Sequence, residues 1–344
     1  MSTVLITFFL ISVIVSFFVT FGVLRLAEKR KVVAEPVRPR DVHKKPVPLW
    51  GGLAIFISLV LLIWLAFFLV DLEYKLMIPI HYLLGVVAGG FILVIFGMVD
   101  DKYNLKPYES IWGPILAAVC AVAVGVRIEA FTNPFDGVFT ISQWPILALG
   151  ISFFWLLGMM YTTKLLDGLD GLASGIVLIG ILVIFFLSIS NKYWQPTIAL
   201  YALIFAGVLF GFLIWNWHPA KIFLGEGGST LVGFILGVLA IISGAKVATA
   251  LLVMGIPVLD VVWVIIRRKF FEHKSVAIAD NKHLHYRLLK TGFSHKQAVL
   301  FLYFIAASFG VSSLFLQSKQ KIIALAVLIL LMLVIGVVVT RREK

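Results

Sequence analysis

The sequence predicts an all-α polytopic membrane protein with about 10–11 transmembrane helices, and three observations support this fold class. Hydrophobic residues make up 61% of the 344 residues and charged residues only 13%, whereas soluble domains average about 25% charged residues. Apolar runs of roughly 20 residues, long enough to cross the hydrocarbon layer, recur from end to end. Lysine and arginine gather in alternate connections between these runs.

Eleven apolar runs can be distinguished along the chain, although only "SGAK" separates the eighth from the ninth. The connections leave no room for a soluble domain of ordinary size, so we expect residues 1–344 to form a single integral-membrane domain. The runs cover approximately residues 3–24, 50–70, 78–99, 111–127, 144–162, 172–190, 196–215, 228–243, 246–266, 298–316 and 321–340.

The charges of the connections predict the topology. The first run has no basic stretch before it and no small-residue cleavage site after it, so it is not expected to be a cleaved signal peptide. Alternate connections carry about 23 Lys and Arg on one side and about 6 on the other. This bias predicts an outside N-terminus, a cytoplasmic C-terminus and cytoplasmic loops at about 25–49, 100–110, 163–171, 216–227 and 267–297.

The net charge of +12 mainly reports this topology. The basic residues are divided among short loops beside the membrane, which argues against nucleic acid as a partner. Anionic lipid headgroups or an anionic soluble substrate are more plausible partners. The lone Cys120 lies inside a run and excludes both an intramolecular disulfide and a cysteine metal cluster.

Acids and histidines occur in the predicted cytoplasmic connections where an ordinary loop would not need them. One connection opens with "DDKYNLKP", another contains "LLDGLDGLA", and a third contains the glycine-rich "GEGGS". The last loop contains "DNKHLHYRLL", and the first ends in the Pro/Gly segment "PVPLWGG". The residues concerned are Asp100, Asp101, Asp167, Asp170, Glu226, Asp280, His283, His285 and Arg287.

This set of residues is typical of phosphoryl transfer. Adjacent carboxylates repel each other and need a cation, protons or basic neighbours. Mg²⁺ prefers oxygen ligands and is usually held by one or two carboxylates together with substrate phosphates. A glycine-rich turn before a helix lets backbone N–H groups approach phosphate oxygens. Acids, a metal and basic donors together suit a reaction in which positioning and charge neutralisation provide most of the catalysis.

Each pattern alone has a plainer interpretation. Two aspartates at a helix end can be solvated, "GEGGS" can be a simple turn, and "HLHYR" can be a charged run facing headgroups. Asp260 and Arg267 can form a structural ion pair. A transporter would place its acids near the bilayer midplane, whereas nearly all of these acids lie at helix ends on one face. Their joint occurrence there favours an active site.

Five motifs in this order resemble the polyprenyl-phosphate N-acetylhexosamine-1-phosphate transferases, the superfamily of WecA, TagO and MraY. "HKKPVPLWGG" is similar to the first-loop motif of that family, "DDKYNLKP" to its Asp-Asp motif and "LLDGLDGLA" to its central motif. "PAKIFLGEGGS" is similar to its Pro-Ala-x-Ile-Phe motif. "HLHYRL" resembles the His-x-His-His-Arg-Leu motif of the WecA/TagO branch rather than the three histidines of MraY.

The resemblance implies an enzyme that transfers an N-acetylhexosamine-1-phosphate, most plausibly GlcNAc-1-phosphate, from a UDP-sugar to polyprenyl (undecaprenyl) phosphate. It would release UMP and use Mg²⁺, or Mn²⁺ in its place. The reaction would be the first membrane step of cell-envelope glycan synthesis, such as lipopolysaccharide or teichoic acid synthesis. The enzyme would lie in the plasma or inner membrane with a cytoplasm-facing site, and some relatives suggest a homodimer.

The resemblance also implies the site residues. The catalytic pair would be Asp100 and Asp101, which with Glu226 would hold the metal. The lipid phosphate is already a nucleophile near neutral pH, so Asp100 would orient it or remove its last proton, and direct attack is favoured over a covalent intermediate. The nucleotide sugar would be bound by Lys44, Lys164, Asp167, Asp170, Asn216, His283, His285 and Arg287.

The sequence departs from the family pattern at several positions. Two asparagines of the central motif are replaced by Tyr161 and Lys164, and an aspartate by Glu226. Lys164 cannot be a metal ligand like the asparagine, so it either places an ammonium on the diphosphate or marks weakened metal binding. The other departures are Tyr286 for a histidine, Leu49 for an arginine and Ser110 for a lysine.

Three alternatives stay open at this point. The same reaction could use another UDP-N-acetyl sugar, including UDP-MurNAc-pentapeptide. The chain could be a non-catalytic homologue, for which Lys164 is the main support. A polytopic transporter is the rival from a different class, and it predicts acids along a continuous path across the membrane.

Overall fold

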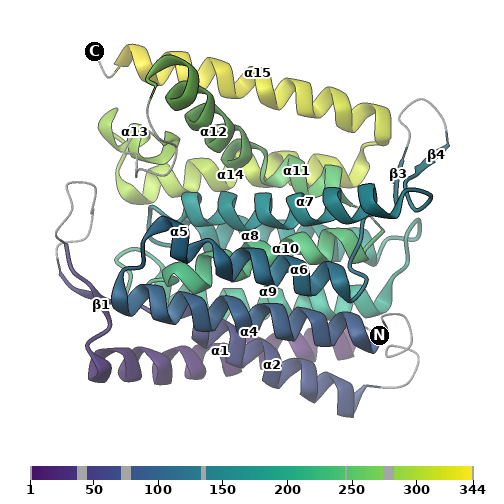
Figure 1. Ribbon diagram of the computed structural model, residues 1–344, viewed down its shortest axis with the longest axis horizontal. Coiled ribbons are helices and arrows are strands. Elements are labelled where there is room, and N and C mark those ends of the chain that lie inside the picture. The colour runs from purple at the N-terminus through teal and green to yellow at the C-terminus, as the bar shows by residue number, and fades with distance from the viewer. Residues whose placement is uncertain are drawn as a thin grey trace.

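The computed structural model describes residues 2–36, 45–70, 79–132, 137–244, 246–273 and 283–342. Lys44, predicted to bind the nucleotide sugar, and Asp280 lie outside these residues. The described chain is almost entirely helical (Figure 1). Its only strands form two short antiparallel pairs: β1 (Val33–Ala34) with β2 (Val47–Pro48), and β3 (Ala130–Thr132) with β4 (Val138–Thr140). The expected all-α polytopic fold is confirmed.

The helices follow the predicted apolar runs closely. In chain order they are α1 (Ser2–Arg30), α2 (Gly51–Leu69), α4 (Ile80–Tyr103), α5 (Pro107–Ser110), α6 (Trp112–Ala123), α7 (Pro145–Leu166), α8 (Leu172–Ser188), α9 (Pro196–Asn216), α10 (Gly225–Ile242), α11 (Val247–Val253), α12 (Gly255–Ile266), the π-helical turn η1 (Arg267–Phe271), α13 (Leu284–Lys290), α14 (His295–Phe315) and α15 (Ser318–Arg342).

Eight of the described helices are long and apolar enough to cross a membrane, and a ninth span results if α11 and α12 are counted together. The run predicted at 246–266 is therefore not one straight helix, because the chain bends by 78° between these two helices. Two further runs correspond to shorter apolar helices, at Pro107–Ala123 and Leu172–Ser188. The predicted 10–11 transmembrane helices include these two helices, which are shorter than the eight that are long enough to cross a membrane.

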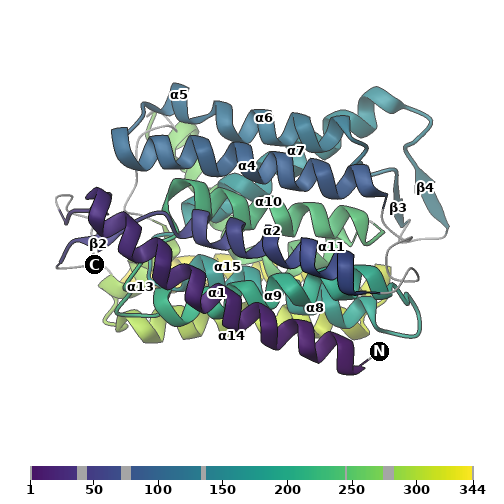
Figure 2. The same cartoon turned by 90° about the horizontal axis from the view of Figure 1, so that it is seen from below.

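The helices divide into an inner and an outer set (Figure 2). In α9 and α10, about four-fifths of the apolar span is buried inside the protein (78% and 83%), whereas in α15 only 11% is. A helix that is apolar on all sides must be covered either by protein or by lipid. The outer helices therefore present their apolar side chains to the membrane.

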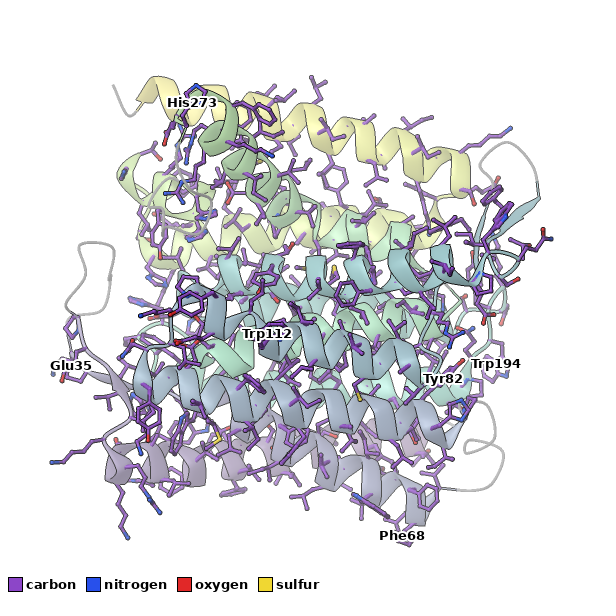
Figure 3. The ribbon with its side chains drawn as sticks, viewed as in Figure 1. Glu35, Phe68, Tyr82, Trp112, Trp194 and His273 are labelled. Carbon is purple, nitrogen blue, oxygen red and sulfur yellow. The ribbon has the colours of Figure 1, made fainter. Side chains whose placement is uncertain are left out.

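The two termini lie at opposite ends of the helix bundle in both views (Figures 1 and 2). One end carries β1 and α13, and we call it the site end; the other carries the β3–β4 hairpin (Figure 1). Glu35 and His273 lie at the site end, and Tyr82 and Trp194 lie at the opposite end (Figure 3). Opposite ends for the termini are what an odd number of crossings produces.

Glycines let three helices meet closely at the site end. A side chain on Gly52 of α2 would collide with the backbone at Gly228 of α10, and one on Gly97 of α4 would collide with Gly227. The N–H groups of Gly51 and Gly52 donate to the carbonyls of Phe223 and Leu224, at 3.0 and 2.9 Å. The Pro/Gly segment of the first loop is thereby joined to the turn before α10.

Candidate active site

Asp100 and Asp101 occupy the last turn of α4. The carboxylate of Asp100, a residue that is 9% exposed, accepts a hydrogen bond of 2.9 Å from the N–H of Leu105 just beyond the helix. Asp101 instead reaches to α10, where its Oδ1 accepts from the N–H of Glu226 at 2.9 Å. The two neighbouring acids therefore have different tasks: Asp100 fixes the chain that leaves α4, and Asp101 joins α4 to α10.

The first turn of α10 is shaped to receive this carboxylate. Gly225 has a φ of 72°, in the left-handed region that favours glycine. A side chain at Gly225 would also collide with the carboxylate of Asp101. Because the first N–H groups of a helix have no partner within the helix, the start of α10 favours a negative charge. Asp101 therefore caps α10 from another helix.

Four of the residues that depart from the family pattern lie together here, around Lys164. The Lys164 ammonium lies 2.7 Å from Glu226 Oε2 and donates to Ser110 Oγ at 3.3 Å. It also lies 5.9 Å from the centre of the Tyr161 ring. The side chains of Lys164 and Glu226 are 23% and 37% exposed, so the pair is only partly covered, and the Oε2 atom of Glu226 is buried. These departures form one local arrangement.

Asp167 follows α7 and lies beside these groups. Burial, together with the negative charges of Glu226 and Asp170, raises the pKa of Asp167 to about 8. Asp101 lies within electrostatic range of Asp100, Asp167 and Glu226. We call Asp100, Asp101, Asp167 and Glu226 the acid cluster. Its members come from three connections that are far apart in the sequence.

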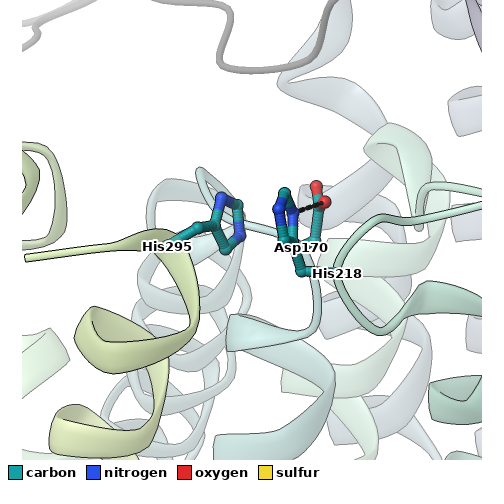
Figure 4. Close-up of side chains that lie close together, drawn as sticks. All are labelled: Asp170, His218 and His295. Atoms are coloured by element: carbon teal, nitrogen blue, oxygen red, sulfur yellow. Dashed lines mark hydrogen bonds and ion pairs between the residues drawn. The ribbon is translucent and has the colours of Figure 1, made fainter.

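Asp170 faces a second group of side chains (Figure 4). Its Oδ2 lies 2.6 Å from His218 Nδ1 and accepts from the N–H of Ala220 at 3.1 Å. The rings of His218 and His295 stack at 3.9 Å with an angle of 15°. Their ligand atoms and that of Asp170 lie within 4.8 Å of one another. An imidazole binds a metal in the plane of its ring, so two stacked rings cannot share one ion. The group is therefore an imidazole–carboxylate pair covered by a second ring.

A third group links α12 to the loop before α13. Asp260 Oδ2 lies 2.7 Å from His283 Nδ1, and Asp260 Oδ1 accepts from the N–H of Leu284 at 3.0 Å. The expected partner of Asp260 was Arg267, whereas its partner is His283, and Arg267 pairs with Glu272 at 3.4 Å. Asp260 thus positions the histidine motif instead of pairing within its own helix end.

His285 packs against the connection between α7 and α8, residues 167–171, which we call the central connection. A side chain on Gly168 would collide with the His285 ring, so these two residues are in close contact. Burial, together with the neighbouring His283 and His295, lowers the pKa of His285 to about 3. His285 is therefore neutral at physiological pH. Arg287 lies on α13 and is partly buried.

Side chains of α9 and α14 also hold the central connection in place. Asn216 is 2% exposed, and its Oδ1 accepts from the N–H of Gly171 and the hydroxyl of Ser174, at 3.2 and 2.9 Å. Its Nδ2 donates to the carbonyl of Ile222 at 2.9 Å. The Tyr303 hydroxyl of α14 donates to the carbonyl of Gly171. Asn216 was predicted to bind the nucleotide sugar, and the structure places its amide against the protein backbone.

The predicted residues therefore meet around one connection. Asp167 faces the acid cluster, Gly168 faces His285, and Asp170 faces His218. Sequence reasoning did not single out His218 or His295. His218 belongs to the quoted "PAKIFLGEGGS" connection, one residue before its proline, but a single histidine in a loop carries no spacing signal. Nothing in the sequence around His295 indicates its contact with His218.

Comparisons with known proteins identify relatives over most of the chain. Residues 83–244 match the family model described as glycosyl transferase family 4. The chain is 33% identical to a decaprenyl-phosphate N-acetylglucosaminephosphotransferase of Mycolicibacterium smegmatis, over 97% of this chain and 88% of that protein. It is 29% identical to a probable undecaprenyl-phosphate N-acetylglucosaminyl 1-phosphate transferase of Bacillus subtilis, over 96% and 90%. An undecaprenyl-phosphate alpha-N-acetylglucosaminyl 1-phosphate transferase of Escherichia coli O157:H7 is 25% identical, over 100% and 92%.

Proposed function

The chain belongs to the glycosyl transferase family 4 of polyprenyl-phosphate N-acetylglucosamine-1-phosphate transferases, and we propose that it transfers GlcNAc-1-phosphate from UDP-GlcNAc to a polyprenyl phosphate. The observation that carries this proposal is the hydrogen bond of 2.9 Å between Asp101 and the N–H of Glu226. It joins the Asp-Asp motif to the glycine-rich motif and brings acids to the start of a helix, where an anion binds favourably.

The described residues fit a bound divalent cation. Asp101 lies within electrostatic range of the other three acids of the cluster, and carboxylate oxygens are the ligands that Mg²⁺ prefers. Mg²⁺, or Mn²⁺ in its place, would be held by Asp100, Asp101 and Glu226, with Asp167 beside them. When bound, the cation would neutralise charge on the diphosphate of the nucleotide sugar.

The reaction then follows from the chemistry of the two substrates. An oxygen of the lipid phosphate attacks the phosphorus that carries the sugar, and the bond from that phosphorus to the UMP oxygen breaks. The products are a polyprenyl-diphosphate sugar and UMP. Asp100 lies at the helix end where it can orient the lipid phosphate or accept its last proton. Neutral His285 can donate or accept a hydrogen bond without adding charge.

The location follows from the helices and the charges. The chain is a multi-pass membrane protein. We place it in the plasma or inner membrane with the site end toward the cytoplasm, because the basic connections gather there. A homodimer stays a prediction. The position of the acids at one end of the bundle supports an enzyme over a transporter, whose acids would follow a path through the membrane.

A UMP-release assay tests this function. Purified protein with undecaprenyl phosphate, Mg²⁺ and UDP-GlcNAc should release UMP, and a panel of other UDP-N-acetyl sugars, including UDP-MurNAc-pentapeptide, identifies the donor. No UMP from any donor, with Mg²⁺ or Mn²⁺, would overturn the proposal and leave a non-catalytic homologue.

Asp101→Asn is the sharpest variant for this assay. The asparagine oxygen can still accept from the N–H of Glu226, so the fold should persist while the carboxylate is lost. We expect UMP release to fall on the order of 100-fold. Glu109→Gln is the matched control, since Glu109 accepts from the N–H of Lys106 in an exposed turn and its loss should leave the rate nearly unchanged.

A further inference from the structure

Among the ion pairs of the described residues, one joins a cationic side chain to the acid cluster. Lys164 pairs with Glu226, while the other ion pairs of the described chain involve Asp170, Asp260, Glu28 and Glu272. A site that holds several acids and receives a diphosphate must offset repulsion between like charges. Lys164 therefore supplies positive charge at the place where the substrate needs it.

The geometry leaves the ammonium able to bind a further group. A lysine ammonium has three N–H donors, and its two partners here are Glu226 Oε2 at 2.7 Å and Ser110 Oγ at 3.3 Å. The third N–H remains for a ligand. The side chains of the pair are 23% and 37% exposed, so the pair is only partly covered by protein, although Glu226 Oε2 itself is buried.

The position of the pair points to a phosphate ligand. Glu226 lies in the first turn of α10, an 18-residue helix whose dipole favours an anion, although the N–H of Glu226 itself is already bonded to Asp101. The same ammonium also occupies the carboxylate that a divalent cation would use. A cation bound at Glu226 would have to displace Lys164 or share that carboxylate with it.

From these contacts we infer that Lys164 is a built-in cation of the site: it neutralises Glu226 and donates to the diphosphate of the nucleotide sugar, so that binding of the nucleotide sugar needs no divalent cation. This inference rests on the proposed function. It concerns binding and leaves a divalent cation its role in the transfer step.

Calorimetric titration of UDP-GlcNAc into the full-length protein in lipid nanodiscs tests the inference without relying on turnover. The wild type should bind with a similar Kd in EDTA and in Mg²⁺, within about threefold. Lys164→Met keeps the length of the side chain and removes its charge, and it should weaken binding in EDTA by about tenfold or more, the effect of one lost charge-assisted hydrogen bond.

Lys221→Met is the matched control. Lys221 is an exposed lysine whose ammonium lies 5.0 Å from the centre of the Trp215 ring. The control removes the same charge near the same end of the bundle and should leave the Kd in EDTA unchanged. An equal loss in both variants would show a general effect of net charge and would overturn the inference.

Two further variants keep the test decisive if Lys164→Met folds poorly. Glu226→Gln retains the ammonium and removes its partner, so binding in EDTA should persist. The double variant Lys164→Asn with Glu226→Asp offers two oxygen ligands without an ammonium, so its binding should become dependent on Mg²⁺.

The wild type itself provides the clearest refutation. Binding that appears only with Mg²⁺ and vanishes in EDTA would overturn the inference and leave the proposed transfer reaction intact. Loss of UMP release with every donor and cation would instead refute the proposed function.

Discussion

At the scale of single residues, the site combines groups whose charge is set by their surroundings. Asp167 has a raised pKa because it is buried beside other acids, and His285 has a lowered pKa because it is buried beside other histidines. Perturbed pKa values of this kind are typical of functional sites. Both residues lie at the central connection. At neutral pH the carboxyl group of Asp167 therefore keeps its proton, and the imidazole of His285 stays unprotonated.

The buried histidine should make the fold sensitive to acid. The folded-state pKa of His285 is about 3, below the value of about 6.5 in an unfolded chain. As pH falls below about 6.5, the unfolded chain binds a proton that the folded protein refuses, and stability decreases. His285→Gln should reduce the acid-induced fall in Tm between pH 6.5 and 4 by about 2–4 °C.

Thermal unfolding in detergent at several pH values measures this effect. His81→Gln is the control, because His81 is an exposed histidine of α4. The same fall in Tm at acid pH for the wild type and for His285→Gln would contradict the prediction.

The residue scale also shows the limits of sequence reading. Lys164 and Glu226 were each recognised as unusual, because each breaks a motif. That they contact each other is a long-range fact, and no periodicity within one sequence encodes it. The stacking of His218 on His295 escaped prediction for the same reason. That Asn216 binds the ligand stays a prediction; in the structure its amide is bonded to the backbone at Gly171 and Ile222.

At the scale of elements, the site depends on helix ends that meet closely. The apolar runs predicted the helices well because about 20 apolar residues suit a membrane span. The run at 246–266 concealed the bend between α11 and α12, since apolar composition does not report helix direction. The glycines in "WGG" and "GEGGS" signalled turns in the sequence, and in the structure they also allow helices to touch.

The variant Gly225→Ala, compared with a control, tests whether the close contact between Gly225 and Asp101 matters for activity apart from the strain of a left-handed backbone. Gly225 has a φ of 72°, and a methyl group there would strike the carboxylate of Asp101. We expect the protein to remain folded and UMP release to fall about tenfold or more, because Asp101 would lose its bond to Glu226.

Gly137→Ala is a closely matched control. Gly137 has a φ of 73° and nothing within 4 Å of an added methyl group. It carries the same backbone cost, about 1–2 kcal/mol, without a collision. Equal activity losses in both variants would refute the role assigned to the contact with Asp101.

At the scale of the whole molecule, the termini at opposite ends of the bundle predict opposite membrane faces (Figure 1). Single cysteines at Ser2, Glu35 and Arg342, in a Cys120→Ser background, can be labelled with a membrane-impermeant maleimide. Ser2→Cys should react in intact cells, and Glu35→Cys and Arg342→Cys only after permeabilisation. Labelling of Ser2→Cys and Arg342→Cys from the same side would contradict an odd number of crossings.

The contact between Tyr303 and the carbonyl of Gly171 shows that the site extends beyond the segment that matches the family model. The segment that matches the family model ends at residue 244, whereas Tyr303 and His285 contact its central connection, and His295 stacks on its His218, from later helices. A gene fragment limited to that segment would encode the acids without the side chains that enclose them. The residues after 244 are thus part of the smallest unit that can form the complete site.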